Sequence, residues 1–124
     1  MEAVSNVFLV LHFVGLAALF GGFLAQITSA TKQITNGMLH GALLSLIAGI
    51  VIVGVSYPLN DQDPTAFPLY DNSKISVKLL IVAAMLIIGY TSKRKSSKSG
   101  QGDTAAWATL GLLTLTNIII AVFW

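Results

Sequence analysis

The chain has 124 residues, of which 55% are hydrophobic and 10% are charged, and its mean hydropathy is +0.80. Soluble domains carry about 25% charged residues, so the composition excludes an ordinary soluble protein and indicates an integral membrane protein. The sequence has no cysteine, which excludes disulfides and cysteine-ligated clusters, and its formal net charge of +2 is too small to indicate nucleic-acid binding.

Four nearly uncharged segments predict four transmembrane spans, at about residues 4–28, 37–57, 75–90 and 104–124. A helix of about 20 apolar residues crosses a hydrocarbon core of about 30 Å, and the third segment is shorter than that. Backbone polar groups in lipid must be paired within each segment, so we expect helices and not strands. The prediction is a single all-α domain over residues 1–124, an integral membrane four-helix bundle.

The first segment contains His12, the only ionisable residue between positions 4 and 28. A titratable group in hydrocarbon is costly and usually faces a partner or a cavity. Two interpretations follow. His12 is either a neutral imidazole that joins two helices by hydrogen-bonding Asn117 or a backbone carbonyl, or it is a functional ligand.

Small residues recur at helical spacing in several segments. Helices in lipid pack closely where small side chains let their backbones approach. We expect these positions to face the bundle interior or a neighbouring subunit; they are Gly15, Gly22, Gly37, Gly41, Ser45, Gly49 and Gly111.

The segment boundaries carry local signals. Pro58 predicts the end of the second helix, because proline cannot continue a helix. Asp71 begins a run of capping residues before the third helix, and Asp103 with Thr104 has the same role before the fourth.

A polar cluster is predicted in the outer half of the membrane. At about 1.5 Å of rise per residue, His12 and Asn117 have similar depths, and the long side chain of Lys78 could reach them. We predict His12, Lys78 and Asn117 as candidate cofactor-binding residues. The alternative for Lys78 is a lysine that extends to the membrane interface.

Basic residues predict the orientation. Lys32 lies in the first loop, and Lys93, Arg94, Lys95 and Lys98 lie in a third loop that we expect to be flexible. Cytoplasmic loops carry the excess of Lys and Arg, so both termini are predicted outside, in a bacterial-type plasma membrane. The four basic residues of the third loop are also candidates for binding lipid headgroups. His40 is expected near the headgroups on the same side.

Two segments resemble a known family of small membrane bundles. Residues 11–22, with a histidine followed by glycines, are similar to the opening helix of HemJ-type protoporphyrinogen oxidases and CopD-type copper-resistance domains. Residues 75–82, with Lys78 near the start, are similar to a helix of the HemJ-type enzymes. The resemblance covers about two helices of four and implies haem b as a cofactor, with His12 as the iron ligand and Lys78 at the site.

Three functions remain as hypotheses. The first is a non-enzymatic accessory subunit that packs against a larger, respiratory-type membrane complex. The second is a haem-binding or porphyrin-redox protein that uses His12 and Lys78. The third is a small oligomeric transporter or channel. The expected partners are the lipid bilayer and other membrane subunits or further copies of the chain, and we expect no catalytic residue.

Overall fold

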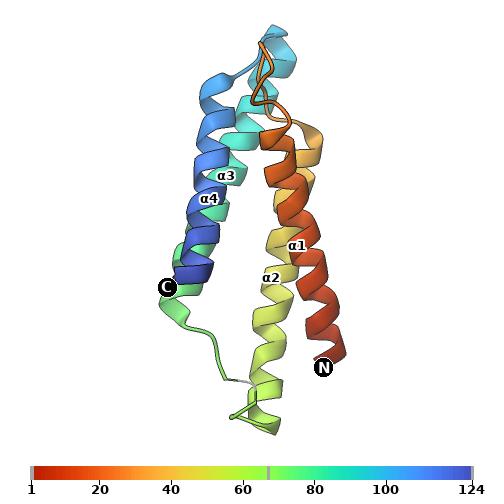
Figure 1. The fold of residues 1–124 in the computed structure, drawn as a ribbon, viewed down its shortest axis with the longest axis vertical. Helices are drawn as coiled ribbons and strands as arrows, with labels where there is room; N and C mark the ends of the chain where they lie inside the picture. Colours follow the sequence, from red (N-terminus) through yellow and green to blue (C-terminus); the bar gives the residue numbers. More distant parts are fainter. Residues whose placement is uncertain (1, 67, 124) are drawn as a thin grey trace.

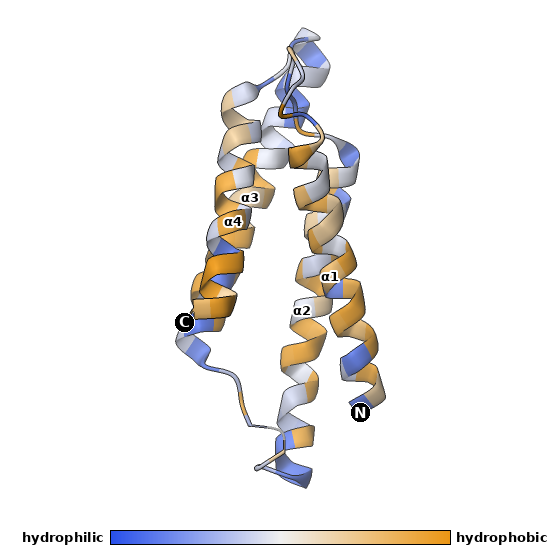
Figure 2. Cartoon of the chain, in the orientation of Figure 1, coloured by the Kyte–Doolittle hydropathy of each residue, from blue (hydrophilic) through white to orange (hydrophobic). Residues whose placement is uncertain are grey.

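The computed structural model describes residues 2–66 and 68–123, which form four helices (Figure 1). The helices are α1 Glu2–Leu24, α2 Asn36–Gln62, α3 Asn72–Ser99 and α4 Thr104–Phe123. No strand occurs in these two ranges, so the all-α prediction is confirmed. All four helices are long and apolar enough to cross a membrane. The chain is therefore a small multi-pass membrane protein, with hydrophobic colour along the helices and hydrophilic colour towards their ends (Figure 2).

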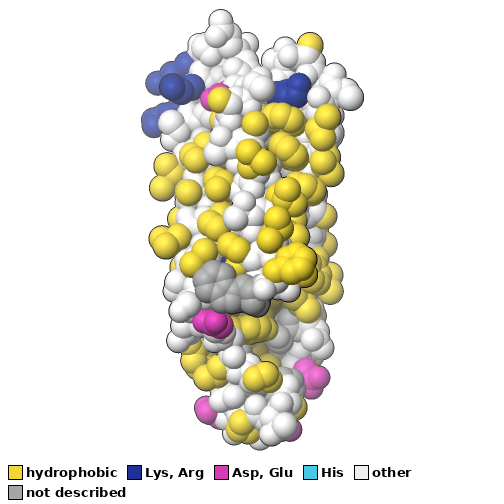
Figure 3. All heavy atoms as spheres, turned by 60° about the vertical axis from the view of Figure 1, so that its left-hand side comes forward, with side chains coloured by type: hydrophobic (Ala, Val, Ile, Leu, Met, Phe, Trp, Pro, Cys, Tyr) yellow, Lys and Arg dark blue, Asp and Glu magenta, His cyan; other side chains and the backbone are white. Residues whose placement is uncertain are grey.

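The helices form two antiparallel hairpins, α1–α2 and α3–α4, that lie side by side (Figure 1). The loops within the hairpins lie at one end of the bundle, which we call the loop end, and both chain termini lie towards the other end. Lys and Arg side chains gather at the loop end, whereas most acidic side chains lie towards the opposite end (Figure 3). The basic residues at the loop end are those from which the orientation of the chain in the membrane was predicted.

The two hairpins share a core near the loop end. Its buried members come from the last turns of α1, the following loop, the start of α2, the middle of α3 and the start of α4. They are Leu19, Ile34, Met38, Leu39, Ala42, Met85, Ala106, Trp107 and Leu110. The loop end is therefore the part of the bundle in which all four helices are packed together.

Helices α1 and α2 come into backbone contact at Gly15 and Gly41, which are both buried. A Cβ atom added to Gly41 would lie 2.5 Å from the carbonyl oxygen of Gly15 and 2.8 Å from the amide nitrogen of Leu19. A Cβ atom added to Gly15 would lie 2.6 Å from the backbone nitrogen of Ser45. Since real Cβ contacts are longer, only glycine permits this approach.

The predicted end of the second helix at Pro58 is wrong, because α2 continues through Pro58 to Gln62. Proline removes one backbone donor, and nearby hydroxyl groups often compensate for this in membrane helices. Here the carbonyl oxygen that loses its helical donor is that of Gly54, four residues before Pro58, whereas the hydroxyl group of Ser56 donates to the neighbouring carbonyl oxygen of Val53 at 2.5 Å. α1, in contrast, ends at Leu24 and does not reach residue 28, because the side chain of Gln26 hydrogen-bonds the backbone of the following loop.

The expected flexible loop after residue 90 is instead helical. α3 continues to Ser99 and carries the four basic residues, and Gly100 ends it in the left-handed conformation with φ of 72°. Lys and Arg are good helix formers and are favourable near a helix C-terminus, so polarity here marks the end of the apolar segment and not the end of the helix. The capping role of Asp71 is confirmed, since its side chain accepts from the amides of Ser73 and Lys74.

Glycine substitutions test the backbone contact. We expect Gly41→Ala to lower the free energy of unfolding by about 1–3 kcal/mol, because the new methyl group overlaps backbone atoms that cannot rotate away. Gly54→Ala on the same helix is the matched control, because no atom lies within 4 Å of an added Cβ there. It should leave stability unchanged or raise it by up to about 1 kcal/mol. Equal effects of the two substitutions on unfolding in detergent would contradict the contact.

Candidate functional site

His12 is hydrogen-bonded to α2. Its Nδ1 atom lies 2.7 Å from the backbone carbonyl oxygen of Ser45 and 3.1 Å from the Ser45 hydroxyl oxygen. A carbonyl oxygen only accepts, so Nδ1 donates in this bond; in a neutral ring the lone pair is then on Nε2. Of the two partners left open by the sequence, the structure therefore gives His12 the backbone carbonyl and not Asn117.

The small residues on α2 make room for this ring. Gly49 lies one turn beyond Ser45, and a Cβ atom added there would be 3.5 Å from both Nδ1 and Cε1 of His12. The close approach at Gly15 and Gly41 brings α1 near enough for His12 to reach α2. The imidazole is half-buried in the hairpin. It joins the two helices through a hydrogen bond from one side chain to the backbone.

The predicted cluster of three polar residues is divided in the structure. Asn117 is buried on α4, and its Nδ2 atom donates to the backbone carbonyl oxygen of Lys78 at 3.4 Å. Asn117 and Lys78 thus lie together, but the contact uses the Lys78 backbone and not its ammonium group. His12 bonds within the α1–α2 hairpin and contacts neither of them through a hydrogen bond. Asn117 Oδ1 is buried and has no hydrogen-bond partner in the described part of the chain.

Polar contacts join α3 and α4 along their length. Besides the Asn117 bond, these pairs are Lys74 Nζ with the Ala121 carbonyl oxygen at 3.2 Å, Thr114 Oγ1 with Met85 Sδ at 3.4 Å, and Ser92 Oγ with Asp103 Oδ2 at 2.8 Å. These polar side chains therefore hold α3 and α4 to each other.

Trp107 joins the two hairpins at the loop end, a role that the sequence analysis missed. Its ring stacks on Phe23 with 4.5 Å between ring centroids, and its Nε1 donates to the Phe23 carbonyl oxygen at 3.0 Å. The Lys32 ammonium lies 5.3 Å from the centroid of the same ring. Gly111, one turn after Trp107, leaves the space that Phe23 fills, since an added Cβ would overlap the Phe23 ring. An aromatic residue followed by glycine one turn later was the available signal.

The remaining small residues have different surroundings. Gly22 is half-buried against the side chain of Met38, and Gly37 is exposed at the start of α2. Gly15, Gly41, Ser45 and Gly111 are buried within the bundle, whereas Gly37 is exposed on the single chain. The expectation that Gly37 faces the bundle interior or a neighbouring subunit therefore stays open only for a neighbouring subunit.

Asp103 fixes the loop between α3 and α4. Its carboxylate accepts from the amide of Ala106 at 3.0 Å and from the hydroxyl of Ser92, and its own amide donates to the Lys32 carbonyl oxygen at 2.8 Å. Its predicted capping role is confirmed. The hydrogen bond from the Ala106 amide, followed by the one from Ser92, lowers the pKa of the Asp103 carboxyl group.

An open groove lies between the start of α2 and the end of α3. It has a volume of about 620 Å³ and includes His40, Tyr90 and three of the four predicted headgroup-binding residues, Lys93, Arg94 and Lys98. Lys95 lies outside it and borders a smaller hollow beside Asp103. Gln26 does not line this groove, and its side chain hydrogen-bonds the backbone of Gln33 in the loop between α1 and α2.

No group of three or more His, Cys, Asp or Glu side chains that could hold a metal ion occurs within residues 2–66 and 68–123. In the comparisons with known proteins, no family model, no curated protein and no solved structure matches the chain.

The Asp103 cap predicts a pH-dependent stability. Because the folded-state pKa is lowered, the charged carboxylate stabilises the fold above the ordinary pKa of an aspartate, and this contribution is lost as pH falls through the lowered value. We expect wild type to unfold at a higher temperature than Asp103→Asn at pH 7, and the difference to shrink at pH 3. Ser92→Ala should show part of the effect, because the Ala106 bond remains. A difference that does not change with pH would contradict this role.

Proposed function

We propose that this protein is a non-enzymatic accessory subunit that packs laterally against a larger membrane complex. The observation that supports the proposal is the outer face of α1. Only 11% of the most apolar window of α1 is buried within the chain, the smallest share among the four helices. Most residues of that window therefore stay accessible, although α1 packs closely against α2 along its other side.

The exposed face of α1 changes in character along the helix. Val7, Val10 and Val14 project from it with 57%, 60% and 52% of their surface exposed. Towards the loop end the same face carries Ala17 and Gly21, and no atom lies within 4 Å of a Cβ added to Gly21. Between Val14 and the exposed Leu24, these two small residues let the backbone of another helix come close, as Gly15 and Gly41 do inside this hairpin.

The polar groups within the helices support the same proposal. His12 is used to join α1 to α2, and Asn117 joins α4 to α3. Trp107 joins the hairpins to each other. His12 and Asn117, which the sequence marked as candidate functional residues, thus both take part in contacts between helices.

A second candidate function, haem binding, is favoured by the tautomer of His12. Histidine ligands to a metal usually donate their other ring N–H to a carbonyl or carboxylate oxygen. The His12 bond to the Ser45 carbonyl oxygen has this form and presents the Nε2 lone pair. His12 would then hold the iron as an axial ligand, and a haem would supply redox chemistry.

Purification in mild detergent, followed by mass spectrometry and an absorbance spectrum, tests both functions. An accessory subunit should co-purify with larger membrane subunits. Ala17→Phe should reduce the recovered partner about tenfold, because it overpacks the close helix contact. Ala83→Phe is the matched control, since Ala83 is also an exposed alanine but lies on α3, and it should leave recovery unchanged.

The contrary outcomes separate the alternatives. Recovery of an isolated chain, or of a complex containing only copies of it, would overturn the accessory function. A Soret band in that preparation would support the second candidate if it is lost in His12→Ala and kept in Ser45→Ala, since the latter retains the backbone carbonyl. A colourless protein that takes up no added haem would overturn the haem function.

A further inference from the structure

The groove at the loop end has the lining of an anion site. Three of its lining residues, Lys93, Arg94 and Lys98, are cationic, and no carboxylate lines it. The other lining residues are Asn36, Leu39, His40, Tyr90, Thr91 and Ser97. The nearby carboxylate of Asp103 is bound to Ser92 and the Ala106 amide, and it borders the separate hollow that includes Lys95. The groove therefore offers many hydrogen-bond donors with unopposed positive charge, which is the chemistry that recognises phosphate.

The start of α2 adds to this charge. The first amides of a helix have no partner within it, and the helix dipole makes this end positive. Thr35 accepts from the amide of Met38, at 3.2 Å, and so satisfies one of these donors. Asn36, the first residue of α2, lines the groove. The positive end of a helix of 27 residues is thus directed towards the same space as the three cationic side chains.

The groove also crosses the boundary between apolar and polar surface. Leu39 and Tyr90 line it where the apolar part of α3 ends, and Arg94, Ser97 and Lys98 line it further along the same helix. Tyrosine is favoured at the level of lipid headgroups. A ligand in this groove would therefore have a phosphate beside the basic residues and an apolar part beside Leu39.

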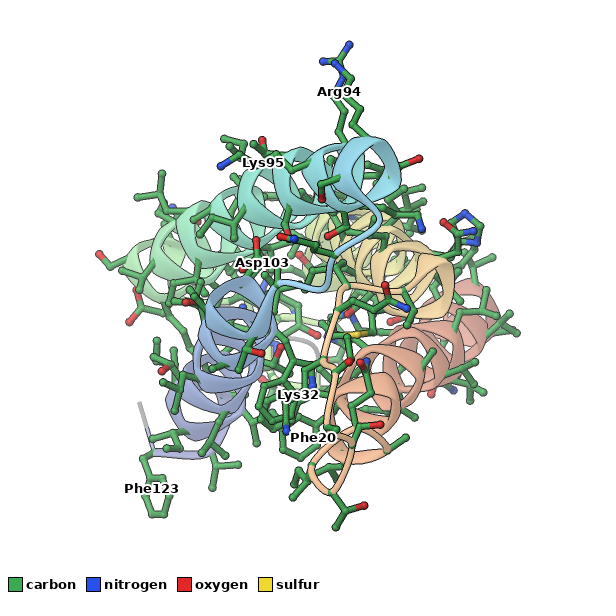
Figure 4. All side chains as sticks on the ribbon, turned by 90° about the horizontal axis from the view of Figure 1, so that it is seen from above. Phe20, Lys32, Arg94, Lys95, Asp103 and Phe123 are labelled. Atoms are coloured by element: carbon green, nitrogen blue, oxygen red, sulfur yellow. The ribbon has the colours of Figure 1, made fainter. Side chains whose placement is uncertain are left out.

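We propose that this groove binds the headgroup of an anionic phospholipid, with its phosphate between Arg94, Lys93 and Lys98 and an acyl chain descending past Tyr90 and Leu39. The inference does not depend on the proposed accessory function, because it rests on a different surface. Lys95 is excluded from the site: it leaves α3 in a different direction from Arg94 (Figure 4) and lines the other hollow.

Native mass spectrometry of the protein in detergent with added dioleoylphosphatidylglycerol or dioleoylphosphatidylcholine tests this site. Wild type should retain the anionic lipid in preference to the zwitterionic one. Arg94→Gln and Lys98→Gln should each weaken retention about fivefold, the effect of one basic residue at an anionic lipid surface. Lys95→Gln, the matched control, removes the same charge from the same helix outside the groove and should change retention less than twofold.

A variant that fills the groove distinguishes binding within the groove from a general attraction of the basic residues to an anionic lipid. Ser97→Trp keeps every charge and fills the groove, so it should abolish the preference for the anionic lipid. Equal effects of Lys95→Gln and Lys98→Gln, or unchanged binding in Ser97→Trp, would overturn the site. Displacement of the lipid by millimolar inorganic phosphate would show that the groove binds free phosphate, and would overturn the assignment to a lipid.

Discussion

The backbone contact between Gly15 and Gly41 is the constraint on which the α1–α2 hairpin depends. Lipid provides no hydrophobic force between helices, so their association depends on close packing and on polar bonds. The absence of side chains at these two positions lets α1 and α2 approach, and this approach brings the His12 ring to the Ser45 carbonyl oxygen at 2.7 Å. The His12 hydrogen bond therefore depends on this backbone contact, and it also stabilises the contact.

The second hairpin is organised differently, and the two meet at the loop end. α3 and α4 are joined by several polar pairs, including Ser92 with Asp103. Trp107 stacks on Phe23, and the Lys32 ammonium lies near the Trp107 ring. The Asp103 amide donates to the Lys32 carbonyl oxygen, so the two hairpins are joined at their loops. The outer face of α1 and the basic groove lie outside this shared core and remain available to lipid or to another membrane protein.

The sequence predicted the parts of this fold that depend on local chemistry. The four apolar segments became four helices, and Asp71 and Asp103 cap helices as expected. Helix ends were predicted less well, because Pro58 indicated a helix break and the basic residues after residue 90 indicated a loop, whereas the backbone stays helical through both. The sequence pattern places residues only by their depth in the membrane. By that criterion, His12 and Asn117 were expected to lie together.

The rotation of each helix about its axis decides which residues meet, and it depends on contacts between distant parts of the chain. Phe23 and Trp107 are 84 positions apart, and no local signal pairs them. Likewise, the depth argument could not say that His12 faces Ser45 on α2 while Asn117 faces α3. The candidate residues were therefore identifiable from the sequence, whereas their partners were not.

The protonation of the His12 ring tests the hairpin contact most directly. Nitrogen NMR of the protein with labelled histidine, assigned with a His40→Gln variant, distinguishes the two tautomers. The account predicts that Nδ1 carries the proton and is hydrogen-bonded, that Nε2 is unprotonated, and that Ser45→Ala leaves this state unchanged because the backbone carbonyl remains. A proton on Nε2, with Nδ1 unprotonated, would contradict it.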